Sequence, residues 1–438
     1  MNWGLGSKSV NNEDIIINLS KLRKIEELNE EFGYVVIEPG VTQNQLSEYL
    51  EKNNSNYIID VTGSSKETSI LGNALERGIA YNSQRVESII RLEVMDKEGA
   101  IFSTGLNHFK DSAFELKNLY PYNIGPDLRG LFFQSNLGIV IGATVKLLKK
   151  HVNLHTIQLN FYHEIDMYQA MNIFKKLCEE NIIQGIPHLP NRERKISSIL
   201  PMLIREFKQK NILISDTEIK KTLDFFMPTD WSGMTYVWGD AKIVKRKIKL
   251  IKKELGKYCK IKIYRNSHFK LIDYALSIFP KNKFLIVLSS FKKIFGLCVG
   301  KPTNMALGSI VTQETFEVNN RNLHEVVDRE VEGFHYLLPI APLNDKYAKL
   351  LVSLTQETLD ENGFRSAITL NIISSNILEA VISVKYESKE YERVMALFEV
   401  LTNTFERNGI YPYRLPRKSK RYQNHYSDLV ETLKKTTI

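Results

Sequence analysis

Four glycine-bearing segments in the first 150 residues constrain this chain more than any other feature of its sequence. They are residues 2–6 (Asn-Trp-Gly-Leu-Gly), 38–42 (Glu-Pro-Gly-Val-Thr), 72–78 and 134–140. Glycine lets the main chain turn sharply and approach a flat or phosphorylated ligand to hydrogen-bonding distance, which a β-carbon would block. Each segment alone also fits an ordinary turn. The order and spacing of all four therefore carry the prediction of a ligand site.

The composition is that of an ordinary globular chain. Its 438 residues suffice for about three folded domains, or two larger ones. The three cysteines, Cys178, Cys259 and Cys298, are too scattered for a disulfide framework, and the nine histidines form no pair at ligand spacing. We therefore expect no metal site. Fifty-nine Lys and Arg against fifty Asp and Glu give a net charge of +9. This mild excess of positive charge slightly favours anionic ligands.

Neither a membrane nor a nucleic acid is an expected partner. The N-terminus lacks the pattern of a signal peptide, and no apolar run approaches the ~18 residues that cross a bilayer, so we expect a cytoplasmic protein. The lysine-rich stretch 242–255 has apolar residues at helical spacing. This pattern predicts an amphipathic helix with a solvated face rather than a nucleic-acid site.

The sequence predicts an α+β fold. In residues 1–150 we expect strands at 15–17, 34–37 and 92–95, and a helix over 43–53 that Thr42 caps. From about residue 152 we expect helices near 167–181 and 241–256. Strands are expected near 153–159, 233–239, 259–264 and 378–386. The recurring order strand, helix, strand predicts a sheet covered by helices on one face.

In their order and spacing, the four segments resemble the FAD-binding domain of the vanillyl-alcohol oxidase and p-cresol methylhydroxylase family of flavoproteins. The resemblance implies an incomplete FAD-binding domain over 1–150 and a substrate-binding cap domain over 151–409, with an antiparallel sheet covered by helices. It also implies a C-terminal return to the FAD domain over 410–438. It implies non-covalently bound FAD, because the residues that link FAD in several relatives would fall near Leu378 and Glu379. The cofactor-binding residues that it implies are Asn2, Gly4, Gly6, Pro39, Gly40, Val41, Ser69, Gly72, Asn73, Glu76, Gly78, Gly138, Ile139 and Val140.

The resemblance also implies a catalytic set. Tyr413 and Arg414 match the pair that binds the phenolate oxygen of 4-hydroxybenzylic substrates, and such a pair can stabilise the charge that develops as hydride leaves. Leu5 stands where many relatives have a second tyrosine. No aspartate follows Tyr81 at the expected place, and Glu87 is the nearest carboxylate, for which a solvated role is the alternative.

Three hypotheses follow for function. The first is an FAD-dependent oxidoreductase that takes hydride from an alcohol or a 4-hydroxybenzylic carbon. Because relatives carry further residues before Asn2 and a further C-terminal loop, the second is an inactive truncated homologue or binding module, and the third is one chain of a split flavoenzyme. The corresponding partners are a small-molecule substrate, a second copy of the chain, an electron-acceptor protein and a complementing N-terminal polypeptide.

Overall fold

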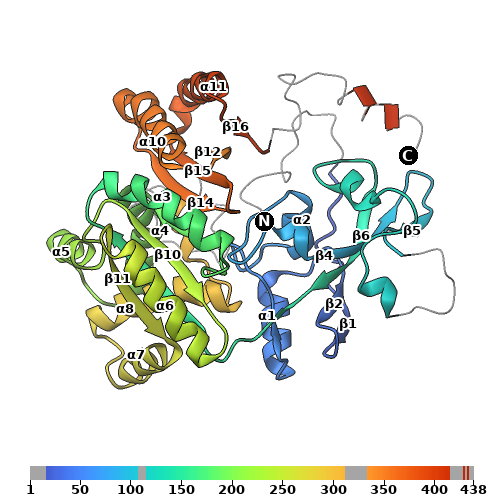
Figure 1. Cartoon of the computed structure of the whole chain (residues 1–438), viewed down its shortest axis with the longest axis horizontal. Coiled ribbons are helices and arrows are strands. Elements are labelled where there is room, and N and C mark those ends of the chain that lie inside the picture. Colours follow the sequence, from blue (N-terminus) through green and yellow to red (C-terminus); the bar gives the residue numbers. More distant parts are fainter. Residues whose placement is uncertain (1–15, 107–114, 311–332, 415–427, 430–431, 434–438) are drawn as a thin grey trace. The chain divides into compact units, whose positions relative to one another are not determined.

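The computed structural model describes residues 16–106, 115–310, 333–414, 428–429 and 432–433. The chain divides into two compact units. Unit 1 comprises 1–150, 299–302 and 414–438, and unit 2 comprises 151–298 and 303–413. Antiparallel sheets with helices in both units confirm the α+β fold class (Figure 1).

Unit 1 is built on a five-stranded antiparallel sheet in the order β1-β2-β6-β4-β5, beside a two-stranded sheet of β3 and β7. The strands are β1 (Ile25–Asn29), β2 (Tyr34–Ile37), β3 (Tyr57–Ile58), β4 (Ile89–Met95), β5 (Ile101–Ser103), β6 (Ile139–Lys146) and β7 (Leu148–Lys149). The helices are α1 (Gln43–Lys52), α2 (Ile70–Leu75) and the 3-10 turns η1 (Arg85–Ser88), η2 (Leu116–Asn118) and η3 (Leu128–Phe132).

Two expectations for unit 1 meet different outcomes. Helix α1 is confirmed, because the Thr42 side chain accepts a hydrogen bond from the Gln45 N–H and the helix buries Leu46 and Leu50. The strand expected at 15–17 is wrong for its described part, because Ile16 and Ile17 are each 58% exposed and lie in no strand. The first strand among the described residues is instead β1, which forms a hairpin with β2.

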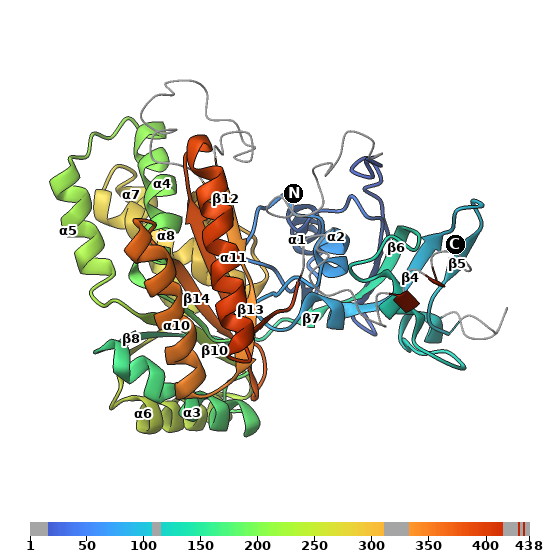
Figure 2. The same cartoon turned by 90° about the horizontal axis from the view of Figure 1, so that it is seen from above.

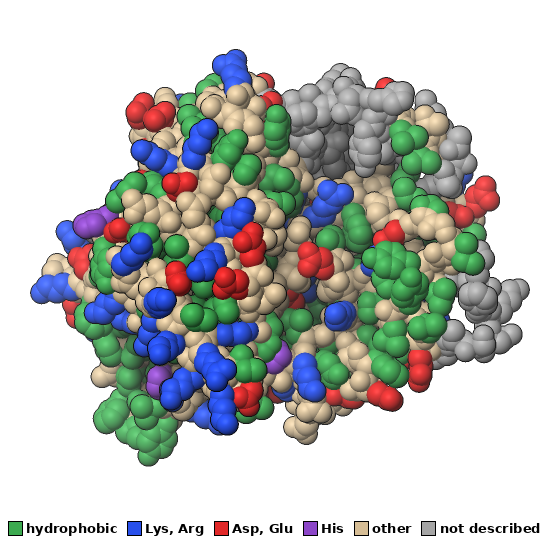
Figure 3. All heavy atoms as spheres, viewed as in Figure 1, with side chains coloured by type: hydrophobic (Ala, Val, Ile, Leu, Met, Phe, Trp, Pro, Cys, Tyr) green, Lys and Arg blue, Asp and Glu red, His purple; other side chains and the backbone are tan. Residues whose placement is uncertain are grey.

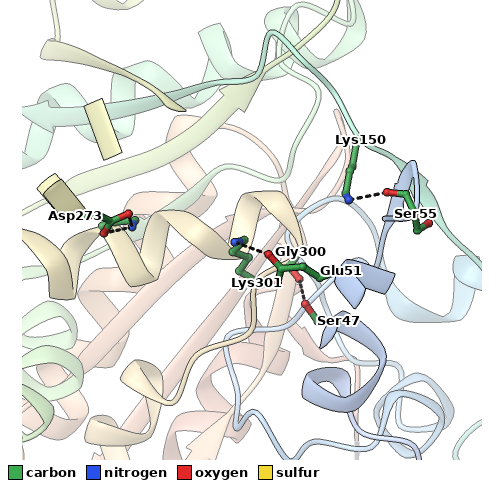
Figure 4. A network of polar contacts seen from close by, with 8 residues as sticks. Ser47, Glu51, Ser55, Lys150, Asp273, Gly300 and Lys301 are labelled. Atoms are coloured by element: carbon green, nitrogen blue, oxygen red, sulfur yellow. Dashed lines mark hydrogen bonds and ion pairs between the residues drawn. The ribbon is translucent and has the colours of Figure 1, made fainter. Parts of the chain in front are cut away.

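A short segment from the middle of the sequence completes unit 1. Residues 299–302 are tethered to α1, where the Ser47 hydroxyl donates to the Gly300 carbonyl at 3.0 Å and Lys301 Nζ lies 3.5 Å from a Glu51 carboxylate oxygen (Figure 4). Gly300 has a φ of +74°, and a β-carbon there would lie 2.8 Å from the Ile59 carbonyl. This position therefore favours glycine for both its conformation and its packing.

Unit 2 contains a nine-stranded antiparallel sheet in the order β11-β8-β10-β9-β14-β15-β13-β16, in which β12 also pairs with β15. Its strands are β8 (His155–Phe161), β9 (His188–Pro190), β10 (Ser232–Val237), β11 (Cys259–Arg265), β12 (Phe334–Leu337), β13 (Pro339–Pro342), β14 (Ala367–Ile372), β15 (Ile377–Lys385) and β16 (Tyr411–Pro412). Its helices are α3 (Glu164–Glu179), α4 (Arg192–Gln209), α5 (Asp216–Phe226), α6 (Ala241–Leu255), α7 (Asn266–Ile278), α8 (Lys283–Gly296), α10 (Asp345–Leu359) and α11 (Tyr391–Arg407).

Helices lie on both faces of this sheet, whereas the sequence predicted cover on one face. Helices α3, α6, α10 and α11 pack on the first face through one large apolar core. Figure 2 shows α4, α7 and α8 on the other side of β8 and β10 from α3 and α6. On this second face, Arg194 of α4 donates to the Ser383 hydroxyl and Tyr264 stacks on Phe295. The sequence did not predict the second layer of helices, because the sheet residues on that face are largely polar. Polar residues that alternate with apolar ones along a strand are typical of a solvent-exposed face.

Helix α6 confirms the amphipathic pattern. It buries Val244, Ile251 and Leu255 in the core of the first face and leaves most of its lysines exposed. Figure 3 shows Lys and Arg side chains gathered on this part of unit 2. In the described residues, no helix is long and apolar enough to span a membrane, and no cluster of His, Cys, Asp and Glu is suited to a metal ion.

The pairing register places one row of residues side by side across the sheet. We call this the central row, and it consists of Lys262, Gln158, Met234, His188, Asn371, Glu379, Ile340 and Tyr411. Side chains alternate between the two faces of a strand. Since Leu370, Leu378 and Ala380 belong to the core of the first face, the central row points to the second.

The three polar residues in the middle of the central row are joined by hydrogen bonds. Nδ1 of His188 lies 2.6 Å from Oδ1 of Asn371, and the Asn371 amide donates to the Glu379 carboxyl. Glu379 is fully buried and Asn371 is 4% exposed. Because Oδ1 of Asn371 is an acceptor, Nδ1 of His188 carries the proton and Nε2 carries the lone pair. Burial lowers the pKa of His188 to about 4.

The lowered pKa of His188 predicts a loss of stability in mild acid. A group whose pKa falls on folding contributes stability above its unfolded pKa, here about 6.5, and that stability is lost as the pH falls towards 4. The full contribution is about 3 kcal/mol. His188→Gln keeps an N–H donor for Asn371 but cannot titrate in this range. Between pH 7 and pH 4 we therefore expect its free energy of unfolding to fall by about 3 kcal/mol less than that of wild type.

Urea unfolding followed by the fluorescence of the buried Trp231 checks this prediction in unit 2. His163→Gln is the control, because His163 is exposed. Parallel pH dependence in wild type and His188→Gln would contradict the assignment.

Candidate functional site

Two of the predicted cofactor segments meet at the start of α2. The Ser69 hydroxyl donates to the Pro39 carbonyl at 2.6 Å and accepts from the Gly72 N–H at 2.9 Å. The Ile70 N–H donates to the Val41 carbonyl at 3.1 Å. The Glu-Pro-Gly-Val-Thr turn and the segment from Ser69 onward therefore form one structural element, although about thirty residues separate Ser69 from Pro39 in sequence.

Glycine at two predicted positions is required by the packing of the protein itself. A β-carbon on Gly40 would lie 2.5 Å from the Leu22 carbonyl oxygen, and one on Gly78 would lie 2.1 Å from Oδ1 of Asn73. Both distances are far below van der Waals contact. The structure thus explains these glycines by backbone and side-chain crowding, in addition to any approach of a ligand.

Asn73 is the predicted residue whose surroundings best fit a bound ligand. Its side chain is 8% exposed, and Oδ1 has no hydrogen-bond partner among the residues that the structure describes. A buried acceptor without a donor costs free energy, and nearly all such groups in proteins are satisfied. FAD carries N–H and O–H donors, so this position fits the cofactor that the sequence predicts. Glu76, at the C-terminal end of α2, is half-buried.

The fourth predicted segment also contacts α2. The Gln134 N–H donates to the Leu75 carbonyl at 2.8 Å, which brings the start of the 134–140 segment to the end of this helix. Ile139 and Val140 open strand β6, where they pair with β4. A β-carbon on Gly138 would lie 2.5 Å from a Val94 methyl carbon. Asn2, Gly4 and Gly6 lie outside the described residues.

The predicted catalytic residues occupy different surroundings. Arg414, in unit 1, donates from Nη2 to the carbonyl of Arg77 at 3.1 Å, and Arg77 lies two residues after the end of α2. Tyr413 is the last residue of unit 2, and its N–H donates to the Leu338 carbonyl at 3.2 Å. Glu87 is exposed on η1. Desolvation and then the charge of Asp60 raise the pKa of Glu87.

Two buried ionisable residues beside α2, Asp60 and Arg85, were not predicted from the sequence, and burial raises the pKa of Asp60. The Asp60 carboxylate accepts hydrogen bonds from the backbone and side chains of Asn82 and Ser83. Arg85 is 1% exposed, donates to Gln43, and donates from its N–H to the Gly78 carbonyl. Burial lowers the pKa of Arg85 to about 10, so it stays charged at neutral pH. Nothing in the local pattern distinguishes this arginine from an exposed one.

The double role of the Ser69 hydroxyl predicts a measurable cost when it is removed. Ser69→Ala loses an N-cap, which costs about 1 kcal/mol, and also the bond to Pro39, which adds about 1 kcal/mol. Ser215 caps α5 in unit 2 by accepting from the Glu218 N–H, so Ser215→Ala is the matched control for a cap. We expect native-state hydrogen exchange to rise more over residues 68–80 in Ser69→Ala than it rises around α5 in Ser215→Ala. Equal rises around the two caps would contradict the link to Pro39.

Comparisons with known proteins find an FAD binding domain in this chain. A family model described as an FAD binding domain matches residues 1–105. The 1'-carboxy-chondrochloren decarboxylase of Chondromyces crocatus is 24% identical over 99% of this chain and 82% of its own length. The 4-cresol dehydrogenase [hydroxylating] flavoprotein subunit of Pseudomonas putida is 27% identical over 42% of this chain and 35% of its own length.

Solved structures show the same fold. The crystal structure of p-cresol methylhydroxylase with substrate bound has a TM-score of 0.74 at 19% identity, over 95% of this chain and 76% of that one. The isoeugenol complex of 4-ethylphenol oxidase from Gulosibacter chungangensis has a TM-score of 0.73 at 18% identity, over 91% and 72%. These solved structures show that the chain has the p-cresol methylhydroxylase-type fold, and the FAD binding domain matched at residues 1–105 supports FAD as its cofactor and the predicted likeness to this family of FAD-linked oxidases.

Proposed function

We propose that this protein is an oxidoreductase that removes hydride from an alcohol or a 4-hydroxybenzylic carbon. When bound, FAD supplies a two-electron acceptor for that hydride. The observation that carries the proposal is the position of Arg414. Its guanidinium donates to the carbonyl of Arg77, two residues after the end of α2, the helix around which three predicted cofactor segments meet.

The residues of this chain have two proposed tasks. Backbone and side-chain groups of the Ser69–Gly78 segment, with Asn73 as a buried acceptor, would hold the cofactor. The Arg414 guanidinium presents several N–H donors, and Tyr413 adds a hydroxyl donor. Donors of this kind stabilise a phenolate oxygen and the negative charge that accumulates there as the benzylic C–H bond breaks. The electrons then pass to oxygen or to an acceptor protein.

The experiment that tests the proposal uses the visible spectrum of the full chain with FAD added. We expect a retained flavin band that 4-hydroxybenzyl alcohol bleaches in the absence of oxygen. Absence of the band would favour the inactive homologue or binding module. A band that appears only with a complementing N-terminal polypeptide would favour the split enzyme.

Decarboxylation is a second candidate function, because the relative matched over nearly the whole chain is named a decarboxylase. A carboxylated substrate such as 4-hydroxymandelate separates the two candidates. Its oxidation with loss of the carboxyl group gives 4-hydroxybenzaldehyde, carbon dioxide, one proton and two electrons. Release of carbon dioxide from 4-hydroxymandelate, without turnover of 4-hydroxybenzyl alcohol, would favour the decarboxylase.

The role of Arg414 predicts a large kinetic effect. We expect Arg414→Ala to lower kcat/KM for a phenolic substrate by two to four powers of ten, about 3 to 5 kcal/mol of transition-state stabilisation. Arg393→Ala is the matched control, because Arg393 also donates to a backbone carbonyl, that of Asn362. Steady-state rates of the two variants check the prediction. An unchanged kcat/KM in Arg414→Ala would remove the phenolate-binding role.

A further inference from the structure

Unit 2 contains a cavity that the proposed function does not use. Its volume is about 140 Å³, and it lies on the second face of the sheet, where residues of β8, β11, α5, α7 and α8 line it. Cavities of ~150 Å³ with apolar walls hold one benzene ring. This cavity therefore has room for a ligand of about one six-membered ring.

Aromatic rings line the cavity in two groups. Within each group, neighbouring ring centroids lie between 5.1 and 6.0 Å apart. The first group consists of Tyr264, Phe269 and Phe295, and the second of Phe226, Phe284 and Phe291. Aromatic rings attract a further ring through offset-stacked and edge-to-face contacts. The lining thus favours a planar aromatic ligand over an aliphatic one of the same volume.

One positive charge of the lining is not neutralised by the protein. Gln158 and Lys262 pair across β8 and β11 and belong to the central row, so both side chains point to the second face. The other lysine of the lining, Lys292, forms an ion pair with Asp273 of α7 (Figure 4). Lys262 forms no ion pair within the part of the chain that the structure describes. An anionic group on a ligand would compensate this charge.

The Gln158 amide supplies a second donor beside Lys262. Its Oε1 accepts a hydrogen bond from the Tyr264 hydroxyl at 3.0 Å, and its Nε2 makes one long contact, at 3.5 Å, with Oδ1 of Asn160. Because an amide nitrogen carries two N–H donors, at least one of them has no partner among the described residues. A carboxylate can accept from this amide and from the lysine at the same time.

The cavity is far from Tyr413, the residue of unit 2 to which we assign phenolate binding. Six strand spacings separate β8 from β16 in the sheet. At about 4.8 Å for each spacing, the two strands lie roughly 25 to 30 Å apart. A ligand in the cavity would therefore not contact Tyr413.

We propose that this cavity is a second small-molecule site, for an aromatic carboxylate of one ring. The ring packs against the two aromatic groups, and the carboxylate accepts hydrogen bonds from Lys262 and Gln158. Phe284 is 50% exposed, so the ligand can enter beside this residue without any opening of the sheet. Neither FAD nor the proposed oxidation takes part, and the inference is independent of the proposed function.

Fluorine NMR of 4-fluorobenzoate with the full chain and added FAD tests this proposal. We expect saturable broadening of the fluorine signal in wild type. Lys262→Gln, at an exposed position, should raise the Kd at least ~10-fold, because a hydrogen bond to a charged group is lost. The matched control is Lys253→Gln, which removes the same charge from an exposed position of α6 on the first face of the sheet. Its Kd should stay within twofold of wild type.

Two further measurements identify the site and the ligand class. Arg414→Ala should bind 4-fluorobenzoate as wild type does, and benzoate should displace the probe at least ~5-fold more strongly than cyclohexanecarboxylate. Binding that is lost in Arg414→Ala and kept in Lys262→Gln would overturn the inference, as would the absence of saturable binding in wild type. Equal displacement by the two acids would overturn the assignment of an aromatic ligand. None of these results changes the outcome of the flavin spectrum that tests the proposed function.

Discussion

The hydrogen bonds of the Ser69 hydroxyl are the interaction on which the arrangement of the predicted cofactor segments in unit 1 depends. It donates to Pro39 and accepts from Gly72, so a single oxygen joins the turn after β2 to the first turn of α2. Gln134 and Arg414 then attach to residues at or just after the end of the same short helix. Four stretches that are far apart in sequence are thereby joined at α2. A six-residue helix is too short to be stable alone, so its position is set by these tertiary bonds.

Much of the fold was predictable because its signals are local. The cap of α1 by Thr42 and the apolar stripe of α6 depend on residues within a few positions of one another, and both are confirmed. The start of α3 was placed three residues late, because its N-cap is His163 rather than one of the usual capping residues. The three-residue run at 15–17 had β propensity but no partner strand for its described part.

Residues of the candidate site could be predicted only where they belong to a sequence motif. Resemblance identified Ser69, Asn73 and Arg414, and their roles remain predictions. Asp60, Arg85 and the central row left no such signal. His188 and Asn371 are 183 positions apart, and their hydrogen bond exists only because β9 and β14 pair. A polar residue between apolar ones, as in Leu370-Asn371-Ile372 and Leu378-Glu379-Ala380, was the one available hint.

The four residues at 299–302 have a consequence for how the protein is made. The Ser47 hydroxyl binds the Gly300 carbonyl, which lies 253 positions further along the chain. The ribosome must therefore synthesise most of unit 2 before this contact of unit 1 can form. Closing so long a loop costs only a little more entropy than closing one half its length, and the contact is therefore affordable once its neighbours have folded. A gene fragment that ends at codon 150 would nevertheless lack this tether and also residues 414–438 of unit 1. Neither unit corresponds to one uninterrupted stretch of DNA.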